Sequence, residues 1–74
     1  MNLKYNVYVE LEANGIDPDW MESHMLAWAM NYSDPDRMIP LMTRWLEAQD
    51  DPHDVLDAIN RGWPYVARSA EIEA

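Results

Sequence analysis

Two histidines stand among fourteen acidic residues, and histidine together with carboxylates is the combination from which metal sites and acid–base catalysts are built. His53 and Asp57 are four residues apart, which places both on one face of a helix. Asp50, Asp51 and Asp54 lie in the same stretch. No third ligand follows at the spacing of a zinc or calcium loop. We therefore predict no metal and no cofactor, and we interpret these acids as helix caps and surface charge.

Nucleophilic catalysis also lacks a sequence signature. The chain has no cysteine, and no catalytic motif surrounds Ser23, Ser33 or Ser69. Gly15 and Gly62 are the only glycines, which is too few for a glycine-rich phosphate-binding loop. A pocket of several hundred Å³ is also difficult to build in 74 residues. We expect a protein that is not an enzyme.

Three aromatic residues are the leading candidates for contact with a partner. Trp20 falls in the first turn of an expected helix, Trp63 falls in a turn between helices, and Tyr8 lies in the opening segment. Tryptophan and tyrosine are enriched among the residues that carry the binding energy of protein interfaces. The alternative is that these rings close the ends of a small core.

The elements that would position these residues are marked by a recurring dipeptide. Asp-Pro occurs at residues 17–18, 34–35 and 51–52, at a regular interval of 17 residues. Aspartate caps the free amides at a helix start, and proline suits the first helical position because its φ is preset. Apolar residues follow at the spacing of one helix face, so the pattern predicts three helices of about ten to thirteen residues. The expected core positions are Met21, Met25, Trp28, Tyr32, Met38, Leu41, Met42, Trp45, Leu46, Val55, Leu56 and Ile59.

Two further prolines, Pro40 and Pro64, affect where the predicted helices begin. Pro40 leaves two alternatives for the second helix, which either kinks at Pro40 or begins near Ile39 after a short turn over residues 35–38. Gly62 predicts the end of the third helix, and Trp63-Pro64 predicts a further short helix that continues to about residue 70.

The opening segment, residues 2–12, fits two structures. Its apolar residues alternate with polar ones and many favour β structure, which is typical of a strand. Leu3, Val7 and Leu11 also have the i, i+4 spacing of a helix, and Asn14-Gly15 suits a helix end. A lone strand would need a partner, such as its twin across a dimer axis. We favour the helix.

Length and composition indicate one small acidic domain over residues 1–74. Six methionines, four tryptophans and no phenylalanine predict a core rich in methionine and tryptophan. So short a chain does not easily cover all of this apolar surface, and a homodimer or docking on a larger protein would cover the remainder. We predict an all-α fold, a compact bundle of four to five short helices, and leave dimerisation open.

The formal net charge of −9 limits the range of partners. Nucleic-acid phosphates and anionic membranes bind clustered Lys and Arg, so we expect neither as a direct partner. The charge serves solubility or fits a basic groove on a partner protein. The chain shows no cysteine, no secretory signal and no long apolar stretch, which predicts a cytoplasmic protein.

No motif resembles a family closely enough to name one, so function is an expectation from type. We expect a protein-binding regulator or inhibitor, like the small acidic accessory proteins of phages and mobile elements, anti-CRISPR proteins among them. In one version, Asp50, Asp51, Asp54 and Asp57 imitate backbone phosphates and occupy a basic nucleic-acid-binding groove on the partner. The alternative is a structural homo-oligomer or a small subunit of a larger assembly.

Overall fold

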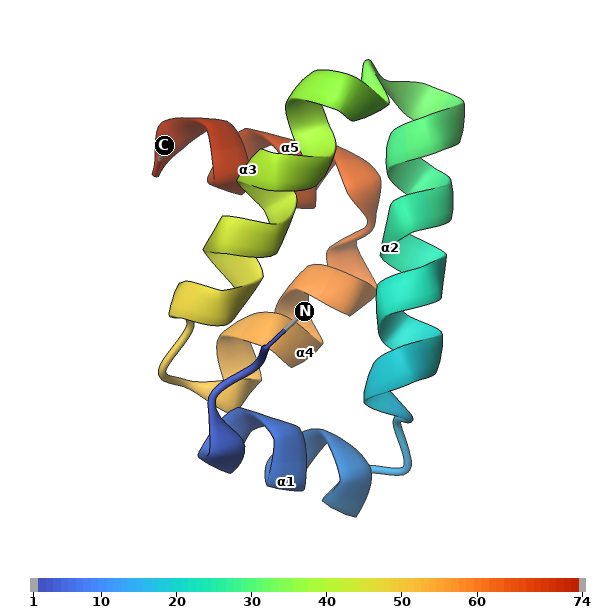
Figure 1. Ribbon diagram of the computed structural model, residues 1–74. Coiled ribbons are helices and arrows are strands. Elements are labelled where there is room, and N and C mark those ends of the chain that lie inside the picture. Colours follow the sequence, from blue (N-terminus) through green and yellow to red (C-terminus); the bar gives the residue numbers. More distant parts are fainter. Residues whose placement is uncertain (1, 74) are drawn as a thin grey trace.

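Each Asp-Pro dipeptide begins a helix in the computed structural model of the protein, which describes residues 2–73 (Figure 1). The side chains of Asp17, Asp34 and Asp51 each accept a hydrogen bond from the backbone N–H two residues later, over 3.0, 3.2 and 2.9 Å. These bonds satisfy amides that a helix start otherwise leaves without a partner. The three predicted helices are confirmed as α2 (Pro18–Tyr32), α3 (Pro35–Ala48) and α4 (Pro52–Arg61).

The opening segment forms the helix α1 (Tyr5–Ala13), and no strand occurs in residues 2–73. Val7 and Leu11 lie one turn apart on this helix and are fully buried, whereas Tyr8 between them remains exposed. The helical spacing of the apolar residues therefore prevails over their alternation. With α5 (Trp63–Ile72), the fold is the predicted all-α bundle, and it has five helices in the described part of the chain.

The helix α3 runs without a break through Pro40. Its start at Pro35 excludes the alternative of a helix that begins near Ile39. Proline has no N–H, so one carbonyl of the preceding turn lacks its helical partner. Pro40 lies on the exposed side of α3, where solvent reaches that carbonyl and the cost of the missing bond is small.

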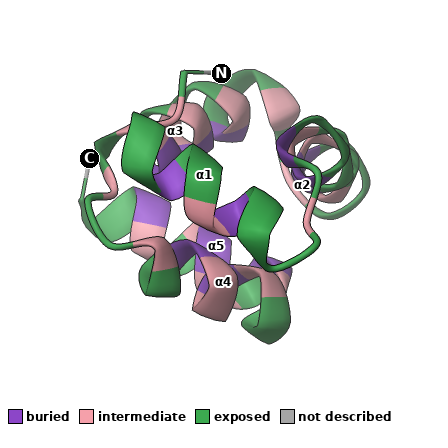
Figure 2. Ribbon diagram, turned by 90° about the horizontal axis from the view of Figure 1, so that it is seen from below, coloured by how far each residue is buried: buried purple, intermediate pink, exposed green. Residues whose placement is uncertain are grey.

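Three of the other helices pack against α5. This helix contacts α2, α3 and α4, while α1 closes one end of the bundle against α2 and α4 (Figure 1). Buried positions lie on the inward sides of the helices, and exposed positions cover their outer sides (Figure 2). The outer side of α2 consequently faces solvent along its length.

The core consists mainly of methionine and short aliphatic side chains. Met21, Met38 and Val55 share one phase of the 17-residue pattern, and each is at most 2% exposed. The prediction of a buried Tyr32 is wrong, because its side chain is 72% exposed. The predicted core residues that are only half-buried at the edge of the core are Trp28, Leu41, Leu56 and Ile59. The buried apolar residues are Val7, Leu11, Met21, Met25, Ala29, Met38, Met42, Trp45, Leu46, Val55, Ala58, Trp63, Val66 and Ala70.

The chain around the start of α1 is tied to the connection between α3 and α4. The backbone N–H of Asn2 donates to the Glu47 carboxylate over 2.7 Å. The Asn6 side-chain amide donates to the Asp50 carbonyl over 2.8 Å, and the Lys4 ammonium forms an ion pair with the Asp50 carboxylate. These contacts fix the position of α1 against the rest of the bundle.

Replacing Asp34 with alanine should lower the free energy of unfolding by about 1 kcal/mol, because the Asp36 amide loses its cap. Asp36→Ala is the matched control, since it removes a carboxylate from the same helical turn and leaves the cap in place. We expect it to cost no more than about 0.3 kcal/mol. Urea denaturation followed by circular dichroism measures both variants. Equal losses would show that the cap contributes nothing beyond its charge.

Candidate functional site

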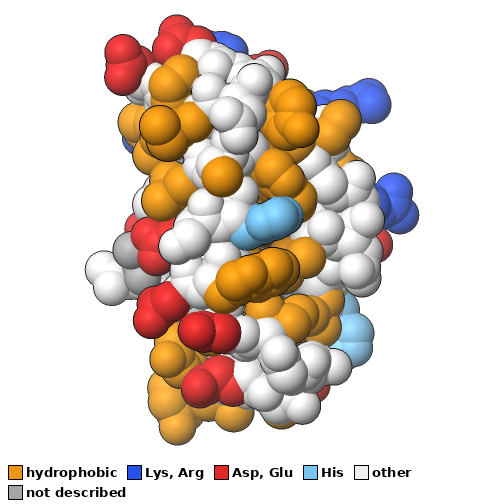
Figure 3. Space-filling view, turned by 90° about the vertical axis from the view of Figure 1, so that its right-hand side faces the viewer, with side chains coloured by type: hydrophobic (Ala, Val, Ile, Leu, Met, Phe, Trp, Pro, Cys, Tyr) orange, Lys and Arg blue, Asp and Glu red, His pale blue; other side chains and the backbone are white. Residues whose placement is uncertain are grey.

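Four ring-bearing residues of α2 follow one another at intervals of four residues. They are Trp20, His24, Trp28 and Tyr32, which we call the aromatic row. The ring of Trp20 stacks on that of His24, with centroids 5.0 Å apart and planes inclined by 15°. His24 meets Trp28 edge-on, at 4.7 Å and 66°. Figure 3 shows hydrophobic side chains along this side of the molecule with a histidine in their middle.

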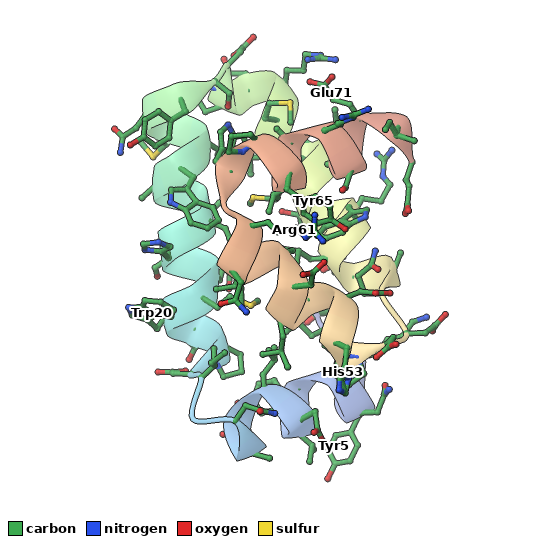
Figure 4. All side chains as sticks on the ribbon, turned by 180° about the vertical axis from the view of Figure 1, so that it is seen from behind. Tyr5, Trp20, His53, Arg61, Tyr65 and Glu71 are labelled. Carbon is green, nitrogen blue, oxygen red and sulfur yellow. The ribbon has the colours of Figure 1, made fainter. Side chains whose placement is uncertain are left out.

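The aromatic row winds around α2 because four residues exceed one helical turn of 3.6 residues, which turns each ring by about 40° relative to the last. Trp20, at the start of the row, is 52% exposed and points away from the bundle (Figure 4). Trp28 is half-buried against the core. Tyr32, at the end of the row, reaches the side of α2 that faces the junction between α4 and α5.

An open apolar groove lies at that junction. It has a volume of about 490 Å³ and is lined by Trp28, Tyr32, Gly62, Trp63 and Pro64. Gly62 alone separates α4 from α5, and its φ of 89° is a conformation that glycine adopts without strain. A glycine has no side chain to fill the space beside Tyr32. A chain of this length has little room for an internal pocket of this size, and the groove instead lies open at the surface, where it takes no space from the core.

The surroundings of the aromatic row are acidic. Residues 5–36 contain seven acidic residues and no lysine or arginine. All five basic residues of the chain lie outside this segment. Figure 3 shows acidic side chains beside the row and basic ones only at the rim of this face. The acidic residues of the segment are Glu10, Glu12, Asp17, Asp19, Glu22, Asp34 and Asp36.

Of the three predicted aromatic residues, Trp20 belongs to the row, and Tyr8 and Trp63 come from other helices at its two ends. Tyr8 is 40% exposed, and carboxylates at the start of α2 act on its hydroxyl, so it lies at the same end as Trp20. Trp63 is only 8% exposed and lies at the other end, where it both closes the core and lines the groove. The alternative in which these rings close the ends of the core therefore holds for most of the Trp63 ring.

The four acids of the predicted patch serve contacts within the chain. Asp50 pairs with Lys4, and the Asp57 carboxylate accepts a hydrogen bond from Arg61 Nε over 2.9 Å. Asp51 caps α4, and Asp54 lies in the first turn of that helix, where the helix dipole stabilises a negative charge. These residues lie away from the aromatic row, as the separate positions of His53 on α4 and Trp20 on α2 show (Figure 4).

Arg61 is held on two sides. Its guanidinium carbon lies 5.0 Å from the centroid of the Tyr65 ring, in addition to the bond with Asp57. That hydrogen bond is the main reason why the pKa of Arg61 is raised above its usual value. Arg61 precedes Gly62 of the groove, and its charge is directed to Asp57 and Tyr65 (Figure 4).

Reasoning from the sequence missed the aromatic row as a unit. It assigned Trp28 and Tyr32 to the core and saw no role for His24. The signal that could have revealed the row is the repeated spacing of four residues within a segment that has no basic residue.

Neither a metal cluster nor a membrane span accompanies this face. Within residues 2–73, no group of three or more His, Asp or Glu side chains is placed to hold a metal ion. Among the described helices, none has the length and apolar character needed to cross a membrane. Comparison with protein-family models finds no matching family, and comparisons with curated proteins and with solved structures find no match.

Glu12→Gln should lower the pKa of Tyr8 toward its ordinary value of 10.0. The Glu12 charge is the largest cause of the raised pKa, followed by partial burial and the charges of Asp19 and Asp17. A raised pKa keeps Tyr8 neutral in the folded chain, so its contribution to stability is present below pH 10.0 and is lost as pH rises through the raised pKa.

The Tyr8 titration is followed by NMR through the signal of its hydroxyl-bearing ring carbon. Glu10→Gln is the control, because it removes an equal charge from α1 at a position that does not act on Tyr8. A Tyr8 pKa that is the same in Glu12→Gln and in the unmodified protein would contradict this account of the corner between α1 and α2.

Proposed function

We propose that the protein is a non-enzymatic, cytoplasmic, protein-binding regulator or inhibitor that occupies a surface of its partner through the aromatic row and the adjoining groove. The single observation that carries the proposal is the continuous row of exposed and half-exposed rings in an acidic segment. Indole and phenol rings that remain exposed contribute less to the stability of the chain than buried rings would.

The row has the properties of an interface anchor. Tryptophan and tyrosine bury a large area and dominate the energetics of many interfaces. Stacking on His24 restricts the rotation of Trp20 before any partner arrives, so less side-chain entropy is lost on binding. Both arguments favour a contact in which the outer side of α2 enters an apolar depression on the partner.

The charge indicates what surrounds that depression. Seven acids and no basic residue in residues 5–36 are complementary to a basic surface, such as the rim of a nucleic-acid-binding groove. Occupying such a groove would inhibit the partner. This is the mode of action that we expected from the small acidic accessory proteins of phages. In this proposal the aromatic row makes the main contact, and the negative charge adds complementarity to a basic surface.

The mimicry version is less well supported. Two acids of the predicted patch, Asp50 and Asp57, already pair with Lys4 and Arg61, which lowers the negative potential there. Exposed pairs of this kind are weak and rearrange readily, so the version is retained as an outcome of the tests.

Self-association is the second candidate. Met30 and Tyr32 are large apolar side chains that are 67% and 72% exposed near the end of α2. Two copies that cover each other's row would hide Tyr32, and Met30 lies outside the row on another side of α2.

Trp20→Ala tests the role of the aromatic row, because Trp20 is half-exposed and its removal leaves the core in place. We expect the tagged protein to recover one stoichiometric partner from the lysate of its native cell. The Trp20→Ala variant should then bind the purified partner at least about tenfold more weakly in calorimetry. Tyr5→Ala is the matched control, since it truncates an exposed ring on α1, outside the row.

Two other outcomes would contradict the proposal. Binding that survives Trp20→Ala but is abolished by neutralising Asp50, Asp51, Asp54 and Asp57, and that falls steeply with salt, would favour phosphate mimicry. Recovery of the protein's own copies alone, with a dimer in sedimentation that Trp20→Ala dissociates, would favour self-association.

A further inference from the structure

We propose that the groove formed by Trp28, Tyr32 and Trp63 receives the guanidinium group of an arginine side chain on the partner protein. This inference rests on the proposed function and identifies the chemistry at one end of the aromatic row. It assigns to the groove a basic, arginine-bearing segment of the partner.

The lining of the groove favours a cation over an apolar side chain. Three of its five residues are aromatic, and the faces of indole and phenol rings attract positive charge. Its remaining residues are Gly62 and Pro64, so no lysine or arginine of this chain repels an entering cation. No carboxylate lines the groove either, so the rings make the direct contact.

The charge around the groove supplies long-range attraction. Asp34 and Asp36 begin α3 directly after Tyr32, and the adjacent Arg37 is paired with the Glu71 carboxylate over 3.0 Å. Such a distribution raises the local concentration of a basic segment before contact is made. Charge complementarity therefore points to a basic occupant, and the rings determine where its charged group lies.

Arginine suits this groove better than lysine. Its guanidinium is planar, weakly hydrated and able to stack on a ring, whereas the lysine ammonium is compact and strongly hydrated. The groove is open, so a flat group can lie against its rings without an enclosing cage. The chain itself shows the same contact, because Arg61 lies over the Tyr65 ring at 5.0 Å.

The nearest cation of the chain does not compete for the site. Arg61 adjoins Gly62, but its guanidinium is bonded to Asp57 over 2.9 Å and lies over Tyr65. The groove is thus left available to an arginine from outside.

The experiment uses three blocked peptides of glycine and serine that carry two arginines, two lysines or two citrullines, titrated into the full ¹⁵N-labelled chain. We expect the arginine peptide to shift the indole N–H signals of Trp28 and Trp63, with Trp20 as the internal reference. Its affinity should exceed that of the lysine peptide by about threefold to tenfold, and the uncharged citrulline peptide should not bind.

Tyr32→Ala should remove this preference, because it deletes one wall of the groove from an exposed position. Tyr5→Ala deletes another exposed ring elsewhere and should leave the preference unchanged. Equal affinity for the arginine and citrulline peptides, a preference that survives Tyr32→Ala, or the absence of shifts at millimolar peptide would each overturn the inference.

Failure here is distinguishable from failure of the proposed function. A partner whose binding depends on Trp20 but not on Tyr32 would leave the row as the binding site and would exclude the groove as an arginine site. Loss of partner binding in Tyr32→Ala, with the peptide preference above, would support the arginine site within the proposed interface.

Discussion

The interior of a 74-residue chain is too small for four tryptophans and four tyrosines. The rings that do not fit inside determine where the surface of this protein is apolar. Methionine, valine, leucine and alanine side chains fill most of the interior, joined by Trp45 and Trp63. The helix α2 contributes Met21 and Met25 to that interior, and it leaves the ring of Trp20 half-exposed and that of Tyr32 largely exposed. The aromatic row is therefore one part of the apolar surface that the core does not accommodate, and α2 fixes the order of its rings.

The fold could be predicted because its determinants are local. An aspartate that caps an amide two residues away acts within one turn, so the three helix starts are visible in the sequence alone. The same holds for the i, i+4 spacing of Val7 and Leu11, which correctly indicated a helix in the opening segment. Burial at helix ends depends on distant neighbours instead. Tyr32 has the spacing of a core residue, but it lines an open groove together with Gly62, thirty positions later, which has no side chain to fill that groove.

The candidate site was only partly predictable for the same reason. Trp20 and Tyr8 are both exposed, but their common corner with Asp17 and Asp19 depends on how α1 meets α2, which the sequence pattern does not show. The acids at residues 50–57 formed a conspicuous run, yet their cations come from both near and far: Arg61 is one helical turn from Asp57, whereas Lys4 reaches Asp50 from the start of the chain. Composition shows how many charges there are, and only the three-dimensional arrangement shows which of them neutralise each other.

The contacts that hold α1 differ in kind from the helix caps. They join residues that are 44 to 46 positions apart, whereas each cap spans two. Forming them closes a long loop and costs chain entropy that a cap does not. We therefore expect α1 to gain these bonds only after α2 and α3 have brought the start of α4 back to it, so that its docking is a late event in folding. The end of the bundle that carries Tyr8 would accordingly be completed after the helix that carries the aromatic row has formed.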